Sequence, residues 1–224
     1  DPLALDAGAL SSALGAAKDL ETVIRTLDRW VVSAIQHGAP SNMVDLLQTV
    51  VAQLDTDAIR TQVRAARRTG DRATLDSIAA GPLDTISAGA AITLAEAMAA
   101  EQRPAKVAEI LDAALGRYPD DVDLLHVASI VLRATFPERA VSCGAAVRAL
   151  RTDRAWSTVD LIAARSAAGR HQEAVSLGKS LRNLDGSKLI AACALGEAQL
   201  KAGQASGAAS VLRTAVRGTS PGQA

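Results

Sequence analysis

Aromatic residues are nearly absent from this 224-residue chain, since Phe, Tyr and Trp together make up 2% of it. This scarcity excludes a core filled by aromatic rings, although hydrophobic residues amount to 49% and most of them are small. Small apolar side chains favour the close packing of helices against helices. The Val/Ile-rich runs that the strands of a Rossmann or TIM fold need are also missing. We therefore expect an all-α protein, long enough to bury a core as one or two units.

The chain also has no net charge and no long apolar run. Lys plus Arg and Asp plus Glu number 24 each. A nucleic-acid binder normally needs a basic excess to replace the counterions of phosphate, so this balance disfavours nucleic acid as a partner. No stretch of about 18 consecutive apolar residues occurs, so we expect no membrane-spanning segment. The start, Asp1-Pro2-Leu3, has neither an initiator Met nor a basic segment before an apolar one, and we interpret the sequence as a piece of a longer protein.

Cysteine and histidine are also scarce, with two and three residues. Cys143 and Cys193 lie 50 residues apart. A disulfide or a shared metal is one interpretation, and we favour buried free thiols that serve as small apolar side chains, which suits a reducing cytoplasm. His37, His126 and His171 show no metal-ligand spacing with one another or with the cysteines. No Ser–His–Asp or Cys–His arrangement is suggested by any motif. We therefore expect no metal, no cofactor and no catalytic residue.

A phrase recurs at nearly constant spacing through the second half of the chain. Its clearest copy is 195–204 (LGEAQLKAGQ). The copies align on Val107, Val141, Ala174 and Ala208, which lie 34, 33 and 34 residues apart. A period of this size, with two helical stretches in each repeat, indicates a helix-turn-helix solenoid.

Each repeat is expected to form a pair of antiparallel helices. Pro104 and Pro137 stand at the start of a second helix, where a missing N–H is tolerated. Gly169 and Gly203 stand where a left-handed residue would end a first helix. The expected helices cover 88–100 and 104–117, 122–134 and 137–150, 156–168 and 172–183, and 188–202 and 205–217. Each pair leaves an apolar face that only its neighbour can cover, so the pairs should stack.

These repeats resemble the tetratricopeptide repeat (TPR). The last copy carries the motif at Leu195, Gly196, Gly203, Ala208, Leu212 and Ala215, and an earlier one matches its second helix and terminal proline at Val107, Leu111, Ala114 and Pro119. The sequence departs from the pattern where Asp153 replaces the terminal proline and where the usual first-helix Trp and Tyr are mostly missing. The resemblance covers about 88–222 and implies a TPR-like helical-hairpin solenoid, a right-handed superhelix of antiparallel helix pairs.

The first 87 residues are helical but less clearly periodic. We expect helices over 9–20, 21–35, 42–54, 58–68 and 73–80, with Ser41 as the N-cap of the third. We therefore divide the chain into an N-terminal region of about five helices, 1–87, and about four TPR-like pairs, 88–222. The whole chain is expected to be one continuous solenoid.

Short stretches in both halves resemble the TPR-containing region that follows the catalytic domain in large bacterial serine/threonine protein kinases. They are 3–6, 27–30, 65–75 and 111–121, in that order. The resemblance implies a parent protein that phosphorylates Ser or Thr while this segment recruits partners or substrates. The chain itself has no Gly-rich phosphate loop, no His-Arg-Asp triplet and no Asp-Phe-Gly triplet, so we expect it not to be an enzyme.

Two features of the N-terminal region have both a functional and a structural interpretation. A basic stripe at helical spacing (Arg60, Arg64, Arg67 and Arg68) could contact phosphate or an acidic partner. We favour a solvated helix face, neutralised by nearby aspartates (Asp57, Asp71 and Asp76). Trp30 is alone in an aliphatic context, and we expect it to pack in the core.

In a TPR register, the concave surface comes from first-helix side chains that face away from the second helices. This nominates eight groove residues: Glu96, His126, Ile130, Arg133, Val159, Asp160, Glu197 and Lys201. Their mixed charge implies no simple preference for acidic or basic peptides, and the carboxylate clamp of chaperone-binding TPRs is not recognisable. We expect a non-catalytic scaffold that binds a protein or peptide partner. Self-association through an uncovered end of the array, and a ligand-sensing regulatory domain, remain as alternatives.

Overall fold

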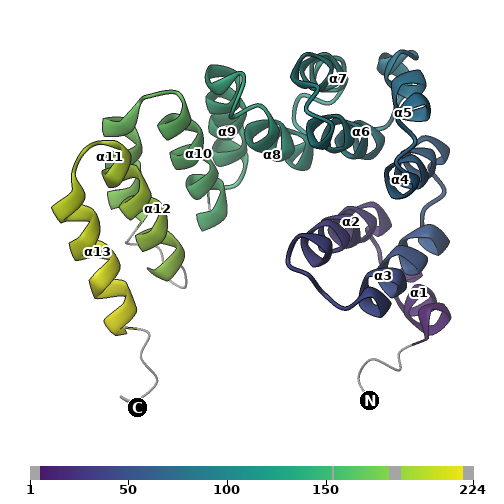
Figure 1. The fold of residues 1–224 in the computed structure, drawn as a ribbon, viewed down its shortest axis with the longest axis horizontal. Coiled ribbons are helices and arrows are strands. Elements are labelled where there is room, and N and C mark those ends of the chain that lie inside the picture. Colours follow the sequence, from purple (N-terminus) through teal and green to yellow (C-terminus); the bar gives the residue numbers. More distant parts are fainter. Residues whose placement is uncertain (1–5, 153, 182–187, 219–224) are drawn as a thin grey trace. The chain divides into compact units, whose positions relative to one another are not determined.

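A computed structural model describes residues 6–152, 154–181 and 188–218, and within these residues it contains helices and no strand (Figure 1). The chain divides into two compact units, Asp1–Gly81 and Pro82–Ala224. The first unit holds α1 (Ala7–Gly15), α2 (Leu20–Gln36), α3 (Ser41–Leu54), α4 (Ala58–Thr69) and α5 (Arg72–Ala79). The second holds a short 3₁₀ segment, η1 (Leu83–Thr85), then α6 (Ala88–Ala100), α7 (Pro104–Arg117), α8 (Val122–Val131), α9 (Pro137–Leu150), α10 (Ala155–Ala167), α11 (His171–Leu181), α12 (Lys188–Lys201) and α13 (Ala205–Gly218).

The first unit has a small aliphatic core between α1, α2 and α3. Its buried members are Ile24, Leu27, Val50, Val51 and Leu54. Leu10 and Leu14 of α1 pack against them from one side and are themselves partly exposed. The helices α4 and α5 form a separate hairpin that ends its first helix at Gly70, a left-handed residue with φ 69°.

The second unit consists of four helix pairs, α6/α7, α8/α9, α10/α11 and α12/α13. Each first helix contacts the first helix of the next pair, so α6, α8, α10 and α12 form a continuous layer. Each second helix packs on its own partner, and α7, α9 and α11 also contact the first helix of the following pair. Leu94, Ala128, Leu161 and Leu195 fill equivalent buried positions along the layer. The stacking is that of a repeat array in which every pair covers the apolar face of its neighbour.

The predicted helix signals in this unit have the expected geometry. Pro104 and Pro137 occupy the first turns of α7 and α9. Gly169 and Gly203 both have φ 74°, which lets each end a first helix in the left-handed conformation that favours glycine. Gln102 fills the corresponding turn of the α6/α7 pair with φ 57°. This left-handed conformation is energetically unfavourable for any residue that has a Cβ atom.

Three expectations for the first unit are wrong. The helix predicted over 9–20 is α1, which ends at Gly15, because the Asp19 carboxylate accepts the Thr22 N–H at 3.1 Å and so begins α2. Ser41 is the first residue of α3 rather than its cap, since the Pro40 carbonyl already accepts from Met43 and Val44. Trp30 is 58% exposed and not a core residue.

Candidate functional site

A groove lies between α10 and α12, the first helices of two adjacent pairs. It has a volume of about 330 Å³. Its lining residues are Val159, Ile162, Ala163, Ser166, Leu189, Ile190, Cys193, Ala194, Glu197 and Ala198. Val159 and Ser166 are two turns apart on one face of α10, as Ile190 and Glu197 are on α12, so both helices present one side to the groove.

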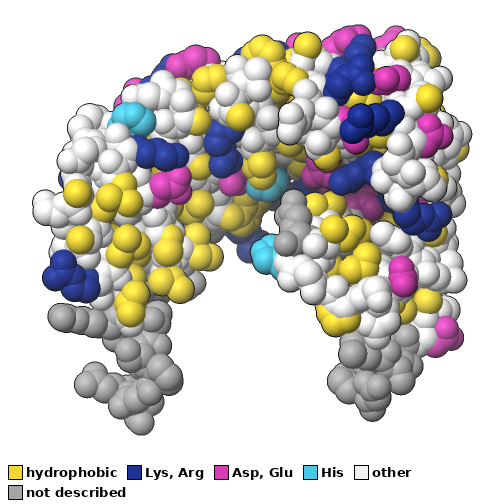
Figure 2. Space-filling model, in the orientation of Figure 1, with side chains coloured by type: hydrophobic (Ala, Val, Ile, Leu, Met, Phe, Trp, Pro, Cys, Tyr) yellow, Lys and Arg dark blue, Asp and Glu magenta, His cyan; other side chains and the backbone are white. Residues whose placement is uncertain are grey.

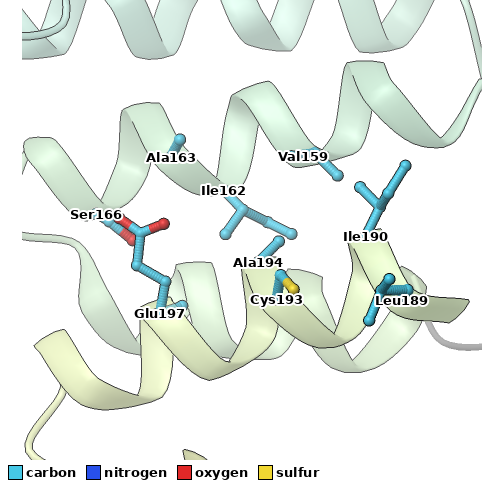
Figure 3. Close-up of a pocket in the computed structure, with 10 residues that line it drawn as sticks. Val159, Ile162, Ala163, Ser166, Leu189, Ile190, Cys193, Ala194 and Glu197 are labelled. Atoms are coloured by element: carbon cyan, nitrogen blue, oxygen red, sulfur yellow. The ribbon is translucent and has the colours of Figure 1, made fainter. Parts of the chain in front are cut away.

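The groove is apolar at one end and polar at the other. Figure 3 shows Val159, Leu189 and Ile190 together at one end, and Ser166 with the Glu197 carboxylate at the opposite end. Leu189 and Ile190 are 47% and 56% exposed although both are large aliphatic residues. In Figure 2 apolar side chains gather over α12 and its neighbours. Large aliphatic residues that cluster on a surface typically mark an interaction site.

Beside the groove, His126 of α8 faces α10. Its Nδ1 atom lies 2.9 Å from Oδ2 of Asp160, close enough for an ion pair when the ring is protonated. The alignment of the two atoms is not that of a hydrogen bond, so the contact is electrostatic rather than directional. The same ring meets the Trp156 ring edge-on, with centroids 4.8 Å apart. Two predicted groove residues are thus brought together across neighbouring first helices.

The other predicted groove residues occupy different surroundings. Val159 and Glu197 line the groove itself. The Lys201 ammonium lies 2.8 Å from the Glu197 carboxylate, one turn along α12. Ile130 is exposed at the end of α8, whereas Glu96 is half-buried on α6 and has a polar or charged partner.

Arg133 lies in the turn that follows α8, and it differs from the charged residues around it. Its Nε atom is buried and has no hydrogen-bond partner. Among the residues that the structure describes, its guanidinium forms no ion pair. A buried N–H donor without a partner is uncommon in a folded protein, so this position calls for an explanation.

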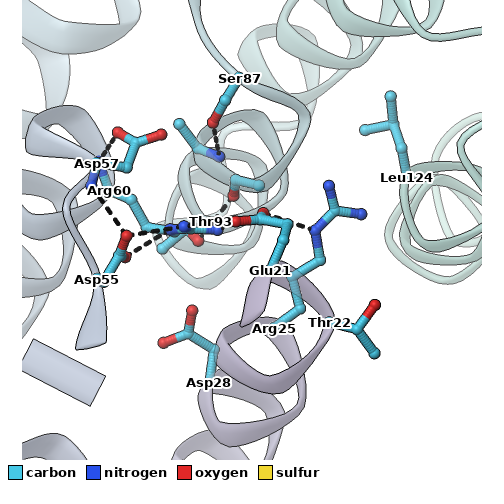
Figure 4. Close-up of polar contacts among 12 residues, drawn as sticks. Glu21, Thr22, Arg25, Asp28, Asp55, Asp57, Arg60, Ser87, Thr93 and Leu124 are labelled. Carbon is cyan, nitrogen blue, oxygen red and sulfur yellow. Dashed lines mark hydrogen bonds and ion pairs between the residues drawn. The ribbon is translucent and has the colours of Figure 1, made fainter. Parts of the chain in front are cut away.

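A buried ionic network, and not a solvated stripe, occupies the basic face of α4 in the first unit (Figure 4). Arg60 donates to both oxygens of Asp55 at 2.6 and 2.8 Å and to both oxygens of Glu21 at 2.7 and 2.9 Å. Arg64 donates to Asp28 at 2.7 and 2.6 Å and to Asp55 at 2.5 Å. The prediction of a solvated face is therefore wrong for Arg60 and Arg64. Their partners also differ from the three aspartates that we expected.

The network lowers the pKa values of Asp55 and Glu21. Burial alone would raise the pKa of Asp55, but hydrogen bonds from Arg60, from the Asp57 N–H and from Arg64 outweigh it and hold that pKa below its usual range. The hydrogen bond from Arg60 is the largest cause of the lowered pKa of Glu21. Because the arginines keep both carboxylates ionised, the network ties α4 to α2 and stabilises the unit; nothing in it suggests a reaction.

The described residues contain neither a membrane-spanning helix nor a cluster of metal ligands. No helix among them has both the length and the apolar character required to cross a bilayer. Within the same ranges, no three side chains of His, Cys, Asp or Glu are grouped so that they could hold a metal ion.

Comparison with known proteins places the architecture. No protein-family model matches the sequence, and no curated protein does. A structure of MamA from MSR-1 matches with a TM-score of 0.54 and 17% identity, over 71% of this chain and 91% of that chain. A putative kinesin light chain of Podosopora anserina with nearly identical TPR-like repeats matches with a TM-score of 0.57 and 19% identity, over 71% and 92%. This chain has a TPR-like repeat fold. The predicted fold class is thereby confirmed, and identities this low show the fold alone.

The TPR-like register explains which groove residues sequence reasoning missed. Val159 was nominated, but its equivalent one period later, Cys193, was not. Conversely, Glu197 was nominated, but its equivalent one period earlier, Ala163, was not. Moving Val159 and Asp160 by the 34-residue period would therefore have found Cys193 and Ala194, but not Leu189 or Ile190.

Proposed function

We propose that the repeat array binds a segment of a partner protein in the groove between α10 and α12. The observation that carries this proposal is the exposed aliphatic end of the groove, formed by Val159, Leu189 and Ile190. Covering these side chains would remove apolar surface from water, which is the main favourable term in protein association. The polar end, with Ser166 and Glu197, would supply direction to the bound segment.

The shape of the site supports a peptide segment rather than a small-molecule substrate. The groove is small for a ligand pocket and open along two parallel helices. Its floor consists of side chains fixed by packing between pairs, so it is formed before a partner arrives. We infer that the neighbouring predicted residues, from Glu96 on α6 to Lys201 on α12, extend the contact surface along the layer of first helices.

Affinity capture with a matched pair of variants tests this proposal. Leu189→Ser/Ile190→Ser removes the aliphatic end, and both residues are exposed, so the fold should persist. Leu150→Ser is the control, because Leu150 is a similarly exposed leucine at the end of α9, a second helix. A partner retained by the wild type and by the control, but lost by the double variant, supports the groove. Equal retention by all three proteins would refute it.

Cys193 offers an independent readout on the purified complex. Cys193 is exposed in the groove, so the expectation of a buried thiol is wrong for this residue. Cys143 is partly buried, and burial raises the pKa of its thiol. A partner in the groove should protect Cys193 from maleimide and leave the slower labelling of Cys143 unchanged. Light scattering over a range of concentrations separates this outcome from self-association, which would protect Cys193 without any added partner.

Two finer inferences also stand as proposals. The stretches 27–30, 65–75 and 111–121 support a parent serine/threonine kinase of bacterial origin, with this segment as its recruiting region in signalling. Reading the gene upstream of the codon for Asp1 tests this: a reading frame without a kinase domain would refute it. A cytoplasmic location is proposed from the two thiols, and fractionation of cells that produce the full protein tests it.

A further inference from the structure

Arg133 stands out because the acidic side chains of the four first helices, α6, α8, α10 and α12, are already engaged. Asp160 lies against His126, and Glu197 lies against Lys201. Asp123 of α8 and Glu96 of α6 also have partners. Among the residues that the structure describes, the cation of Arg133 therefore has no carboxylate of its own, although its Nε atom is shielded from water.

The repeat register places Arg133 on the same surface as the groove. The first helices α8 and α10 begin 33 residues apart, at Val122 and Ala155. Arg133 therefore occupies the position that Ser166 occupies in the next pair, and Ser166 lines the polar end of the groove. A segment that leaves the groove across α10 toward α8 would pass this position.

We propose that the bound segment carries an acidic side chain that pairs with Arg133 while an aliphatic side chain of the same segment fills the groove. This inference rests on the proposed function and names the chemistry of the partner. A guanidinium binds a carboxylate through two parallel hydrogen bonds, and the two Nη atoms of Arg133, which are not among the buried unpaired atoms, can donate them. The carboxylate comes from an Asp or Glu side chain within the segment.

The helix spacing fixes how far apart the two anchors lie. Neighbouring helices pack about 8–10 Å apart. The path from α8 to the middle of the α10–α12 groove is one and a half such spacings, roughly 12–15 Å. An extended chain advances about 3.3–3.6 Å per residue. The acidic residue should therefore lie about four residues from the aliphatic anchor.

Synthetic peptides and the full 224-residue chain test the pairing. Each fluorescein-labelled, C-terminally amidated peptide contains two adjacent leucines and one glutamate. The glutamate is separated from the leucine pair by zero, three or seven Gly/Ser residues, and it precedes the leucines in one set of peptides and follows them in the other. Glutamine versions serve as charge controls, and one set with a free C-terminus tests a terminal carboxylate as an alternative anchor. Fluorescence polarisation gives the affinities of the wild type, Ile190→Ser, Arg133→Gln and Arg148→Gln. Arg148 is an exposed arginine on α9, so it controls for general loss of charge.

The proposal predicts that the peptide with three spacer residues binds about tenfold more tightly than its glutamine version. Arg133→Gln should remove this preference, and Arg148→Gln should retain it. Equal affinities of the glutamate and glutamine peptides for the wild type, or a preference that survives Arg133→Gln, would overturn the inference. In that case a loss of binding in Ile190→Ser would leave the groove proposal standing. Peptides that bind Ile190→Ser as well as the wild type, or no peptide at all, would count against both.

Discussion

Replacing Arg60 by Met tests whether the ionic network stabilises the first unit. The side chains of Arg60 and Asp55 are 3% and 1% exposed. Removing one member of a buried pair typically costs about 3–5 kcal/mol, because the remaining charge stays buried without its partner. Asp55 would still accept from Arg64 and from the Asp57 N–H, so we expect the lower end, about 3 kcal/mol. Met is close to Arg in size and favours helices, which limits packing losses in α4.

Urea unfolding followed by hydrogen exchange and mass spectrometry would measure this loss in peptides from α2 and α4. Arg68→Met is the control, since Arg68 is exposed on the same helix and should change stability by no more than about 0.5 kcal/mol. Combining Arg60→Met with Asp55→Asn should recover part of the loss, because the buried carboxylate that has lost its two hydrogen bonds from Arg60 is then neutral. If Arg60→Met lowered the free energy of unfolding by less than about 1 kcal/mol, and by no more than the control does, water would have to reach the network. That result would refute our reasoning.

The remaining predictions concern pH and backbone geometry, and urea unfolding followed by circular dichroism checks each. Glu21 and Asp55 have lowered pKa values in the folded state, so the stability that they contribute is present above about pH 4 and is lost as the pH falls further. Asp55→Asn should flatten this decrease of the unfolding free energy in acid. An unchanged slope of the unfolding free energy against pH would contradict the prediction. Gly178→Ala should lower the free energy of unfolding by about 1–3 kcal/mol, because the new Cβ atom would lie 3.2 Å from Cα of Leu195 on α12. The control Gly116→Ala on α7 places its Cβ atom where nothing lies within 4 Å, and it should raise the free energy of unfolding by about 0.5–1 kcal/mol. Gln102→Gly should stabilise by about 0.5 kcal/mol by relieving its positive φ, and a loss would mean that the Gln102 side chain has a role of its own.

The sequence predicts the repeat half well because its signals are local. Proline and glycine mark helix starts and ends through backbone geometry alone, as Pro137 and Gly203 do. The first half depends on contacts between distant residues. Arg60 meets Glu21 across 39 positions and Arg64 meets Asp28 across 36, so the spacing within α4 could not show that this charged face is buried.

The groove illustrates a different limit of sequence reasoning. Ile190 and Leu195 are both aliphatic residues of α12, yet Leu195 is buried and Ile190 is exposed. Helical periodicity identifies an apolar side but not which part of it a neighbouring helix covers. Only the stacking of α10 against α12 leaves Leu189 and Ile190 uncovered, which is why neither was nominated.

Each pair packs on the next through both its first and its second helix, as in a one-dimensional chain of coupled units. In such a chain the outer units fray more readily than the inner ones, and α12/α13 is the outermost pair among the described residues. A segment that reaches from Arg133 to the groove would contact three consecutive pairs and so oppose the fraying of the outermost one. Partner binding should then slow amide hydrogen exchange in α13, although this helix lines no part of the groove. The stabilising effect of the partner could therefore be measured in a helix that the partner does not contact.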